Sequence, residues 1–309
     1  MKAVVTGCAG FIGSHLCDRL LAMGMEVVGI DRCDRPWNLA LALPSPRFHL
    51  VSQDLSTVDW NSVLHHCRFI FHLAAVAGVR SSWGQPFGHY CQTNIHLTQV
   101  LLDAALHCPT LERLVFASSS SVYGLVAAMP TPETTPPQPI SPYAVTKYAA
   151  EQLVNLYHQN YGLPTVTLRF FTTYGPRQRS QMAFAKTIQA IAQGTPVDIY
   201  GDGQQRKDFV YVTDVVQSMV LAIHCPNLSG ELINVGSGTT TAVQGVFALI
   251  ADLMQKSWRY VYHPMPFGDG SPSWADLTKA QKVLGYAPQV DLKTGLLSQI
   301  KDWQEHYCG

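Results

Sequence analysis

The chain has 309 residues, of which 47% are hydrophobic and only 14% are charged. This composition excludes a disordered chain, which combines few apolar residues with many charges. The 21 basic residues balance 21 acidic ones, so the formal net charge is zero. We therefore expect no nucleic-acid partner, because such binding depends on an excess of Lys and Arg that neutralises phosphates.

The compartment follows from what the sequence lacks. No stretch approaches the roughly 18 uninterrupted apolar residues that a membrane-spanning helix needs, and the first residues resemble a strand, not a signal peptide. The eight cysteines include no Cys-x-x-Cys spacing, which argues against a zinc site or a disulfide framework. We expect a reduced cytoplasmic protein with no metal and no membrane partner.

Short apolar runs alternate with helical patterns through the first half of the chain. The predicted strands are residues 3–5, 26–30, 48–51, 68–73 and 113–117, with predicted helices at 14–23 and 94–107. Such alternation indicates βαβ units and a parallel sheet covered by helices on both faces. The predicted fold class is α/β, with a Rossmann-type doubly wound sheet.

The pattern changes in the second half. A proline-rich loop precedes the strong predicted helix 143–161, and a Gly/Pro/Arg loop after the strand 166–171 leads to a helix at about 183–193. Residues 209–212 and 232–235 again look like strands of the sheet. We predict two interleaved domains: 1–173 with 209–238 for a dinucleotide, and 174–208 with 239–309 as a smaller C-terminal substrate domain.

A glycine-rich turn follows the first predicted strand and opens the first predicted helix. Gly7, Gly10 and Gly13 form the pattern G-x-x-G-x-x-G, which permits a tight turn and close approach to a pyrophosphate held by the helix N-terminus. Asp31 ends the next strand, where a carboxylate binds ribose hydroxyls and repels a 2′-phosphate. This context predicts NAD, a preference that the adjacent Arg32 weakens.

Other residues are predicted to contact the same cofactor. Asp54 suits the adenine amino group, with capping of its own loop as the alternative, and small residues after the fourth strand let the cofactor pass close to the backbone. The complete predicted cofactor set is Gly7, Gly10, Phe11, Ile12, Gly13, Asp31, Arg32, Asp54, Leu55, Leu73, Ala74, Ala75, Tyr143 and Lys147.

Tyr143 and Lys147 form a Y-x-x-x-K pattern on a predicted helix. Residues four apart share one helix face, and a lysine ammonium beside a tyrosine favours the phenolate and lowers its pKa from about 10. Alone, such a pair is more often a solvated surface pair than a site. The serine-rich run 118–124 strengthens the functional interpretation, because it follows a strand at the edge where open α/β sheets bind ligands.

In these motifs the chain resembles the extended branch of the short-chain dehydrogenase/reductase superfamily, the nucleotide-sugar epimerases and dehydratases. The resemblance covers essentially the whole chain and includes Asn94 and the segments 169–172 and 174–177. It implies Ser119, Tyr143 and Lys147 as catalytic residues, NAD as cofactor and a UDP-sugar as substrate. It also implies a homodimer, with the helices 94–107 and 143–161 pairing as a four-helix bundle.

Differences within the superfamily narrow the implied reaction. The 4,6-dehydratases carry an Asp-Glu pair after the catalytic Ser/Thr, and the decarboxylases usually keep the glutamate, whereas this chain has Ser120 and Ser121. Epimerisation at C4 needs only one base and the nicotinamide, with Tyr143 taking the 4-hydroxyl proton. The serine run, Thr172 and other segments together look most like the UDP-glucuronate 4-epimerases.

The same residues bear on how a glucuronate would be handled. Its 4-keto intermediate is a β-keto acid that readily loses carbon dioxide, so an epimerase must hold the carboxylate out of alignment with the ketone. Hydroxyls at Ser120, Ser121 and Thr172 suit this task; the alternative is that they satisfy local backbone groups. The predicted substrate residues are Arg80, Ser119, Ser120, Ser121, Tyr143, Thr172, Arg179, Met182, Phe184 and Lys207.

Three alternatives remain open: a UDP-glucose/UDP-galactose 4-epimerase, a UDP-glucuronate decarboxylase or 4,6-dehydratase, and a non-catalytic NAD-binding scaffold. Lys207 and Pro266 stand where relatives often carry arginine, which affects nucleotide binding. Residues 169–207 hold six basic and two acidic residues, a local excess of +4. We expect these cations, Arg177 among them, to surround a small and highly charged substrate.

Overall fold

The computed structural model describes residues 1–269 and 271–307. Its centre is a seven-stranded sheet in the order β11-β6-β5-β4-β1-β2-β3, in which every pairing is parallel. The strands are β1 (Lys2–Thr6), β2 (Glu26–Asp31), β3 (Phe48–Ser52), β4 (Cys67–His72), β5 (Arg113–Ser119), β6 (Thr165–Phe170) and β11 (Glu231–Val235). The predicted Rossmann-type sheet is confirmed, with its switch point between β1 and β4.

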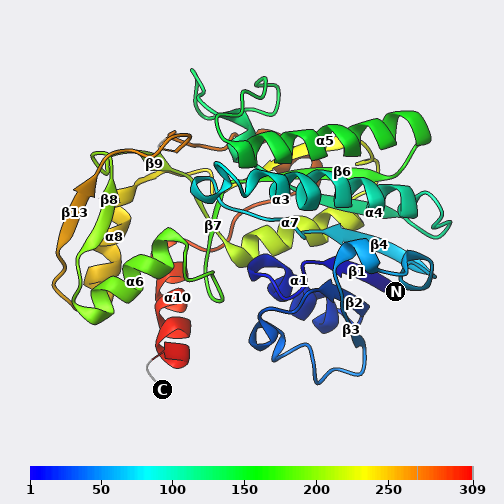
Figure 1. The fold of residues 1–309 in the computed structure, drawn as a ribbon, viewed down its shortest axis with the longest axis horizontal. Helices are drawn as coiled ribbons and strands as arrows, with labels where there is room; N and C mark the ends of the chain where they lie inside the picture. Colours follow the sequence, from blue (N-terminus) through cyan, green and yellow to red (C-terminus); the bar gives the residue numbers. More distant parts are fainter. Residues whose placement is uncertain (270, 308–309) are drawn as a thin grey trace.

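Helices cover both faces of this sheet (Figure 1). One face packs against α1 (Phe11–Ala22), α7 (Val212–His224) and α9 (Thr278–Leu284), and the other against α2 (Trp60–Val63), α4 (Leu97–Ala105) and α5 (Pro142–Tyr161). The helix α3 (Phe87–Cys91) lies beside α4 and α5. Burial on both faces explains why the strands are continuous apolar runs, not alternating ones.

Local sequence signals set the boundaries of the helix that carries Tyr143 and Lys147. Ser141 caps α5 by accepting a hydrogen bond from the Ala144 amide at 3.2 Å, and Pro142 occupies the first helical turn. Gly162 ends the helix in the left-handed conformation with φ of 69°. These caps fix where α5 begins, and its first two turns therefore lie at the edge of the sheet where the strands end.

The C-terminal part forms a third hydrophobic core beside the sheet. Its helices α6 (Ala183–Gln193), α8 (Val243–Leu253) and α10 (Leu292–Tyr307) gather with the parallel pair β8 (Val197–Tyr200) and β13 (Tyr260–His263), at the left of Figure 1. The short strands β9 (Arg206–Lys207) and β12 (Thr241–Ala242) pair antiparallel. Arg179, which precedes α6, affects the pKa of Tyr143 on α5, so this part approaches the edge of the sheet where α5 begins.

Two sequence-based predictions about elements are wrong. Residues 209–212 do not join the main sheet, because β10 (Phe209–Tyr211) pairs with β7 (Thr172–Tyr174) and α7 already begins at Val212. The first helix begins at Phe11, not Ser14, directly after the glycine turn. The early start places the helix N-terminus against the glycines, where a pyrophosphate is expected.

No helix within the described ranges is both long and apolar enough to cross a membrane. The same ranges hold no group of three His, Cys, Asp or Glu side chains arranged to bind a metal, and their cysteines are free. Cys308 lies outside the described residues.

Candidate active site

The glycine turn between β1 and α1 has no room for side chains. Gly7 has φ of +72°, and a Cβ there would lie 2.8 Å from the Ala74 amide nitrogen. A Cβ on Gly13 would lie 2.1 Å from the Gly7 carbonyl oxygen. Among the described residues no side chain caps the N-terminus of α1, so its first amides and positive dipole end are available to a pyrophosphate.

The Asp31 carboxylate lies beside this turn at the end of β2. Its Oδ2 accepts a hydrogen bond from the Ala9 amide at 3.1 Å, and its Oδ1 accepts one from the Cys33 amide at 3.0 Å. Each carboxylate oxygen offers a second lone-pair site, and the two amide contacts hold the group in place. The turn and the carboxylate together fit the pyrophosphate and ribose of NAD.

The remaining predicted cofactor residues divide into two groups. Leu73, Ala74 and Ala75 follow β4, and the backbone of Leu73 and Ala74 lies beside Gly7, as a route along the backbone requires. Asp54 caps its own short helix, η2 (Leu55–Thr57), because its Oδ1 accepts from the Ser56 amide at 3.0 Å; this is the alternative that the sequence left open. Arg32 is exposed, 3.6 Å from the carboxylate of Asp34.

The buried side chain of His72, which sequence reasoning missed, holds the end of β1 beside the segment that follows β4. The Thr6 hydroxyl lies 2.7 Å from His72 Nδ1, and the Thr98 hydroxyl lies 2.9 Å from its Nε2. Thr98 donates its own proton to the Asn94 carbonyl oxygen, so it accepts from Nε2–H and His72 is a neutral Nε2 tautomer. Burial lowers the pKa of His72 to about 3. Its contacts with Thr6 at the end of β1 and with Thr98 in α4 reveal this role.

Asn94 connects the segment that follows β4 to helix α5. Its Oδ1 accepts from the Val76 amide at 2.8 Å, and its Nδ2 donates to the Val76 carbonyl oxygen and the Thr146 hydroxyl, both at 3.0 Å. Asn94 lies in a π-helical segment, η4 (Gln92–His96), between α3 and α4. Such segments are frequent at functional sites, and here the irregular turn aims an amide at the residue before Lys147.

The structure brings Ser119, Tyr143 and Lys147 together where β5 ends and α5 begins. Ser119 hydrogen-bonds the Tyr143 hydroxyl, and the Lys147 ammonium lies 4.3 Å from the centre of the Phe116 ring. Tyr90 of α3, which sequence reasoning also missed, places its ring edge-on to Tyr143 with centroids 6.3 Å apart. Ser119 and Tyr143 are therefore in contact, and Lys147 lies one helical turn beyond Tyr143 on α5.

Burial has the largest effect on the pKa values of Tyr143 and Lys147. It raises the pKa of Tyr143 above its ordinary value, outweighing the Ser119 hydrogen bond and the positive charge of Arg179, which lower it. Burial lowers the pKa of Lys147 to about 7, against the effect of Glu151, which raises it. The predicted net lowering of the Tyr143 pKa is therefore wrong for the protein alone, and the cation that lowers it is Arg179, not Lys147.

Three predicted hydroxyl side chains lie in the segments that follow β5 and β6. Ser119 pairs with Phe170 across β5 and β6, so Ser121 and Thr172, each two residues further on, reach the same edge of the sheet. Ser120 and Ser121 open the short helix η5 (Ser120–Tyr123), and Thr172 opens β7; all three are half-buried. Ser119 Oγ donates to Ser121 Oγ at 3.1 Å.

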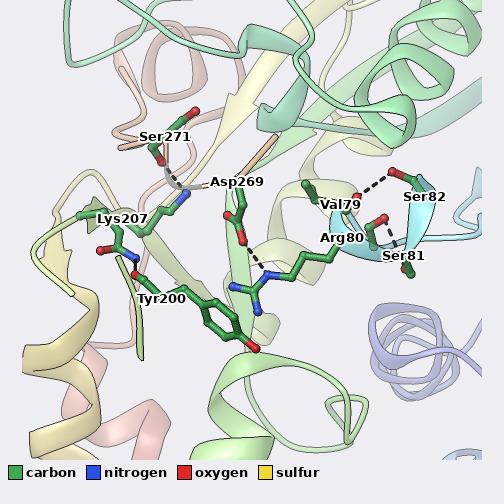
Figure 2. Close-up of polar contacts among 10 residues, drawn as sticks. Val79, Arg80, Ser81, Ser82, Tyr200, Lys207, Asp269 and Ser271 are labelled. Carbon is green, nitrogen blue, oxygen red and sulfur yellow. Dashed lines mark hydrogen bonds and ion pairs between the residues drawn. The ribbon is translucent and has the colours of Figure 1, made fainter. Parts of the chain in front are cut away.

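Two predicted anion-binding cations converge from separate segments (Figure 2). Arg80, in the short helix η3 (Arg80–Ser82), donates from Nε to Asp269 Oδ2 at 2.8 Å and lies 3.8 Å from the centre of the Tyr200 ring. Lys207 of β9 donates to the Ser271 carbonyl oxygen. Burial lowers the pKa of Lys207, and Asp269 opposes that effect. The two cations and the aromatic ring suit a nucleoside diphosphate.

Other predicted substrate residues fit less well. Arg177 pairs with Asp18 of α1 at 2.8 Å, so its charge is directed to the glycine helix. Phe184 is 3% exposed and packs against Phe209 in the third core, which leaves its ring little surface for a base. Met182 precedes α6 in an extended conformation.

The site is that of a dinucleotide-dependent enzyme that moves a proton and a hydride at an alcohol carbon. This conclusion follows from the sheet, from the glycine turn with Asp31, and from Ser119, Tyr143 and Lys147. Residues 3–236 match the model of the NAD dependent epimerase/dehydratase family. The chain belongs to this family.

Relatives span the whole chain. It is 42% identical over 317 residues to a protein of Bacillus subtilis (strain 168) named "Uncharacterized UDP-glucose epimerase YtcB", covering 100% of both chains. It is 32% identical to the UDP-glucuronate 4-epimerase of Thermodesulfobacterium geofontis (strain OPF15), over 98% of this chain and 95% of that one. The structure of the UDP-glucuronic acid 4-epimerase of Bacillus cereus with UDP-glucuronic acid and NAD superimposes with a TM-score of 0.96 at 37% identity, over 99% and 100% of the two chains.

Proposed function

We propose that this enzyme is an NAD-dependent UDP-glucuronate 4-epimerase, which interconverts UDP-glucuronate and UDP-galacturonate. The observation that carries the proposal is that Ser120, Ser121 and Thr172, which follow the paired ends of β5 and β6, offer hydroxyls in place of acids. The similarity to the Bacillus cereus and Thermodesulfobacterium geofontis epimerases supports the same substrate.

The residues present suit a single-base mechanism. When bound, NAD supplies the carbon that takes the hydride from C4 of the sugar and later returns it. Tyr143, in its phenolate form, removes the 4-hydroxyl proton, and Ser119 holds that oxygen by a hydrogen bond. After the 4-keto sugar turns over, Tyr143 returns the proton to the oxygen on the new face. Lys147 in its ammonium form stabilises the phenolate and suits the nicotinamide ribose hydroxyls.

The protein must also prevent the carboxylate of the 4-keto intermediate from leaving as carbon dioxide. Loss of carbon dioxide requires the C5–C6 bond to align with the π system of the ketone, and hydrogen bonds to the carboxylate prevent that alignment. We assign this task to Ser121 and Thr172, which follow the paired residues Ser119 and Phe170 by two positions each. An ionised acid at either position would repel the carboxylate.

The decisive experiment is incubation of the NAD-loaded protein with UDP-glucuronate and separation of the products. UDP-galacturonate is expected; its absence contradicts the proposal. UDP-galactose formed from UDP-glucose under the same conditions supports the alternative epimerase, which the name of the Bacillus subtilis relative favours. Carbon dioxide together with a UDP-pentose identifies a decarboxylase.

Replacing Ser121 and Thr172 together by alanine is expected to lower kcat/KM for UDP-glucuronate by roughly 10²–10⁴-fold, since hydrogen bonds to a charged group contribute about 1.5–3 kcal/mol each. We also expect released carbon dioxide to rise relative to epimerisation. Both products are measured in one reaction.

The matched control for that variant is Thr173→Ala. Thr173 is the next residue of β7, and its hydroxyl donates to the Phe171 carbonyl oxygen at 3.1 Å. Its loss is expected to lower stability by about 1 kcal/mol without changing the product ratio. Equal product ratios in all the variants contradict the assigned role of the hydroxyls.

We also propose a homodimer that works in the reducing cytoplasm, with NAD held by residues 1–173 and 209–238 and the sugar nucleotide held by residues 174–208 and 239–309. On α5, Val145 and Leu156 share one helix face and are 44% and 47% exposed, an apolar surface that a second copy would cover as a four-helix bundle. Light scattering of Leu156→Glu tests this: a parent that is already monomeric contradicts it.

A further inference from the structure

A buried ion pair joins Glu151, one helical turn beyond Lys147 on α5, to Arg169. Glu151 on α5 and Arg169 on β6 are both 3% exposed at their side chains. Arg169 Nε donates to Glu151 Oε2 at 3.0 Å, and its Nη2 donates to Oε1 at 2.5 Å. Ser118, paired with Arg169 across β5 and β6, donates to Oε2 at 2.8 Å. The carboxylate is therefore held from the sheet by three donors.

Glu151 has a second cation within reach of its helix position. Lys147 precedes it by four residues on α5, the spacing at which oppositely charged side chains meet. Both side chains are buried, where charges attract far more strongly than in water. The Lys147 ammonium nevertheless lies over Phe116, while Glu151 is turned to Arg169. A Lys147–Glu151 ion pair is thus the competing arrangement.

We infer that Arg169 is a positioning residue that keeps Glu151 from pairing with Lys147. By holding the carboxylate in a two-point contact, Arg169 leaves the lysine ammonium for Tyr143 and the cofactor ribose. Glu151 still acts through space, favouring the charged form of Lys147. The inference rests on the proposed roles of Tyr143 and Lys147 and goes beyond them, because neither Glu151 nor Arg169 touches the reacting atoms.

Glu151 lies one helical turn beyond Lys147 on α5, and Lys147 lies one turn beyond Tyr143. A charge removed from the Glu151–Arg169 pair therefore changes the electrostatic field at both side chains and moves the pH at which the tyrosine loses its proton. Removing Glu151 leaves an unopposed cation and favours proton loss, whereas removing Arg169 leaves an unopposed anion and disfavours it. The other groups that face the two side chains stay the same in both variants; they are His72 of β4, Tyr90 of α3, and Arg179 with its neighbour Arg35. Tyr123 of η5 differs, because its ring contacts Arg169; burial raises its pKa and Arg169 opposes that rise.

The test is an ultraviolet titration of tyrosinate in the protein without substrate. Subtracting the curve of each background carrying Tyr143→Phe isolates this tyrosine from the 13 in the chain. The titration midpoint is expected to fall in Glu151→Gln and to rise in Arg169→Met, each by on the order of one pH unit. In the double variant Glu151→Gln/Arg169→Met it returns close to the parent value.

If the Glu151–Arg169 pair has only a structural role, the expected result is different. Loss of packing lowers the folded fraction but does not move a midpoint in opposite directions for the two single variants. Glu112→Gln, which removes the half-exposed Arg68–Glu112 pair at 2.5 Å, is the control and is expected to shift nothing.

Midpoints that move in the same direction, or not at all, overturn the inference. If Arg169→Met does not fold, Glu151→Gln and the double variant decide the matter between them. The acid limb of kcat in active preparations should follow the same order. Because the titration needs no substrate, an enzyme that does not epimerise UDP-glucuronate refutes the proposed function without affecting this result.

Discussion

Replacing Tyr143 by phenylalanine is expected to lower kcat for epimerisation by roughly 10²–10⁴-fold, the range for losing a positioned general acid–base group. The phenyl ring keeps the packing against Tyr90 but has no hydroxyl to exchange a proton with the sugar. NAD should remain bound, because the glycine turn and Asp31 are unchanged. Product formation and NAD content are measured on the same preparation.

The control for this variant is Tyr161→Phe. Tyr161 is the last residue of α5 and is 66% exposed, so removing its hydroxyl leaves the site intact and turnover at the parent level. Full activity in Tyr143→Phe excludes the proposed base. Loss of NAD from Tyr143→Phe shows instead that the hydroxyl holds the cofactor.

Replacing Gly13 by alanine is expected to abolish NAD binding and to lower the free energy of unfolding by about 3 kcal/mol. The new Cβ would lie 2.1 Å from the Gly7 carbonyl oxygen, which is backbone and cannot move without opening the turn. Urea unfolding with and without NAD measures both effects. A bound cofactor at 100 times its Kd adds about 2.7 kcal/mol to the parent, and none to the variant.

Gly88→Ala is the matched control. Gly88 lies in α3, where an added Cβ meets nothing within 4 Å, so alanine is expected to be neutral or to stabilise by about 0.4–1 kcal/mol. Its stabilisation by NAD should equal that of the parent. If Gly13→Ala binds NAD with parent affinity, the close approach at this turn is not required.

Most of the main sheet is predictable from the sequence because its strands are long apolar runs separated by helical patterns. Periodicity is local, and burial on both faces makes the signal strong. Because this signal is local, it also assigns Phe209–Tyr211 to the main sheet, which is wrong. Its residues are as apolar as those of a core strand, but its pairing with β7 depends on where the chain returns after α6.

The site shows a similar division. The glycine turn, Asp31 and the Y-x-x-x-K spacing are short-range patterns, and the structure assembles them at one edge of the sheet. His72 and Tyr90 act through neighbours distant in sequence, so they carry no local signature. Glu151 had a detectable signal: it continues the helical spacing of Tyr143 and Lys147 by one further turn.

The sequence by itself determined the chemical groups available to this protein and the cofactor that they suit. It placed an excess of positive charge between residues 169 and 207, but only the tertiary structure decided how that charge is used. Arg169 is neutralised by Glu151 and Arg177 by Asp18, while Arg179 faces Tyr143. The physical reason is that the effect of a charge depends on its distance from a partner and on its burial, and the fold sets both.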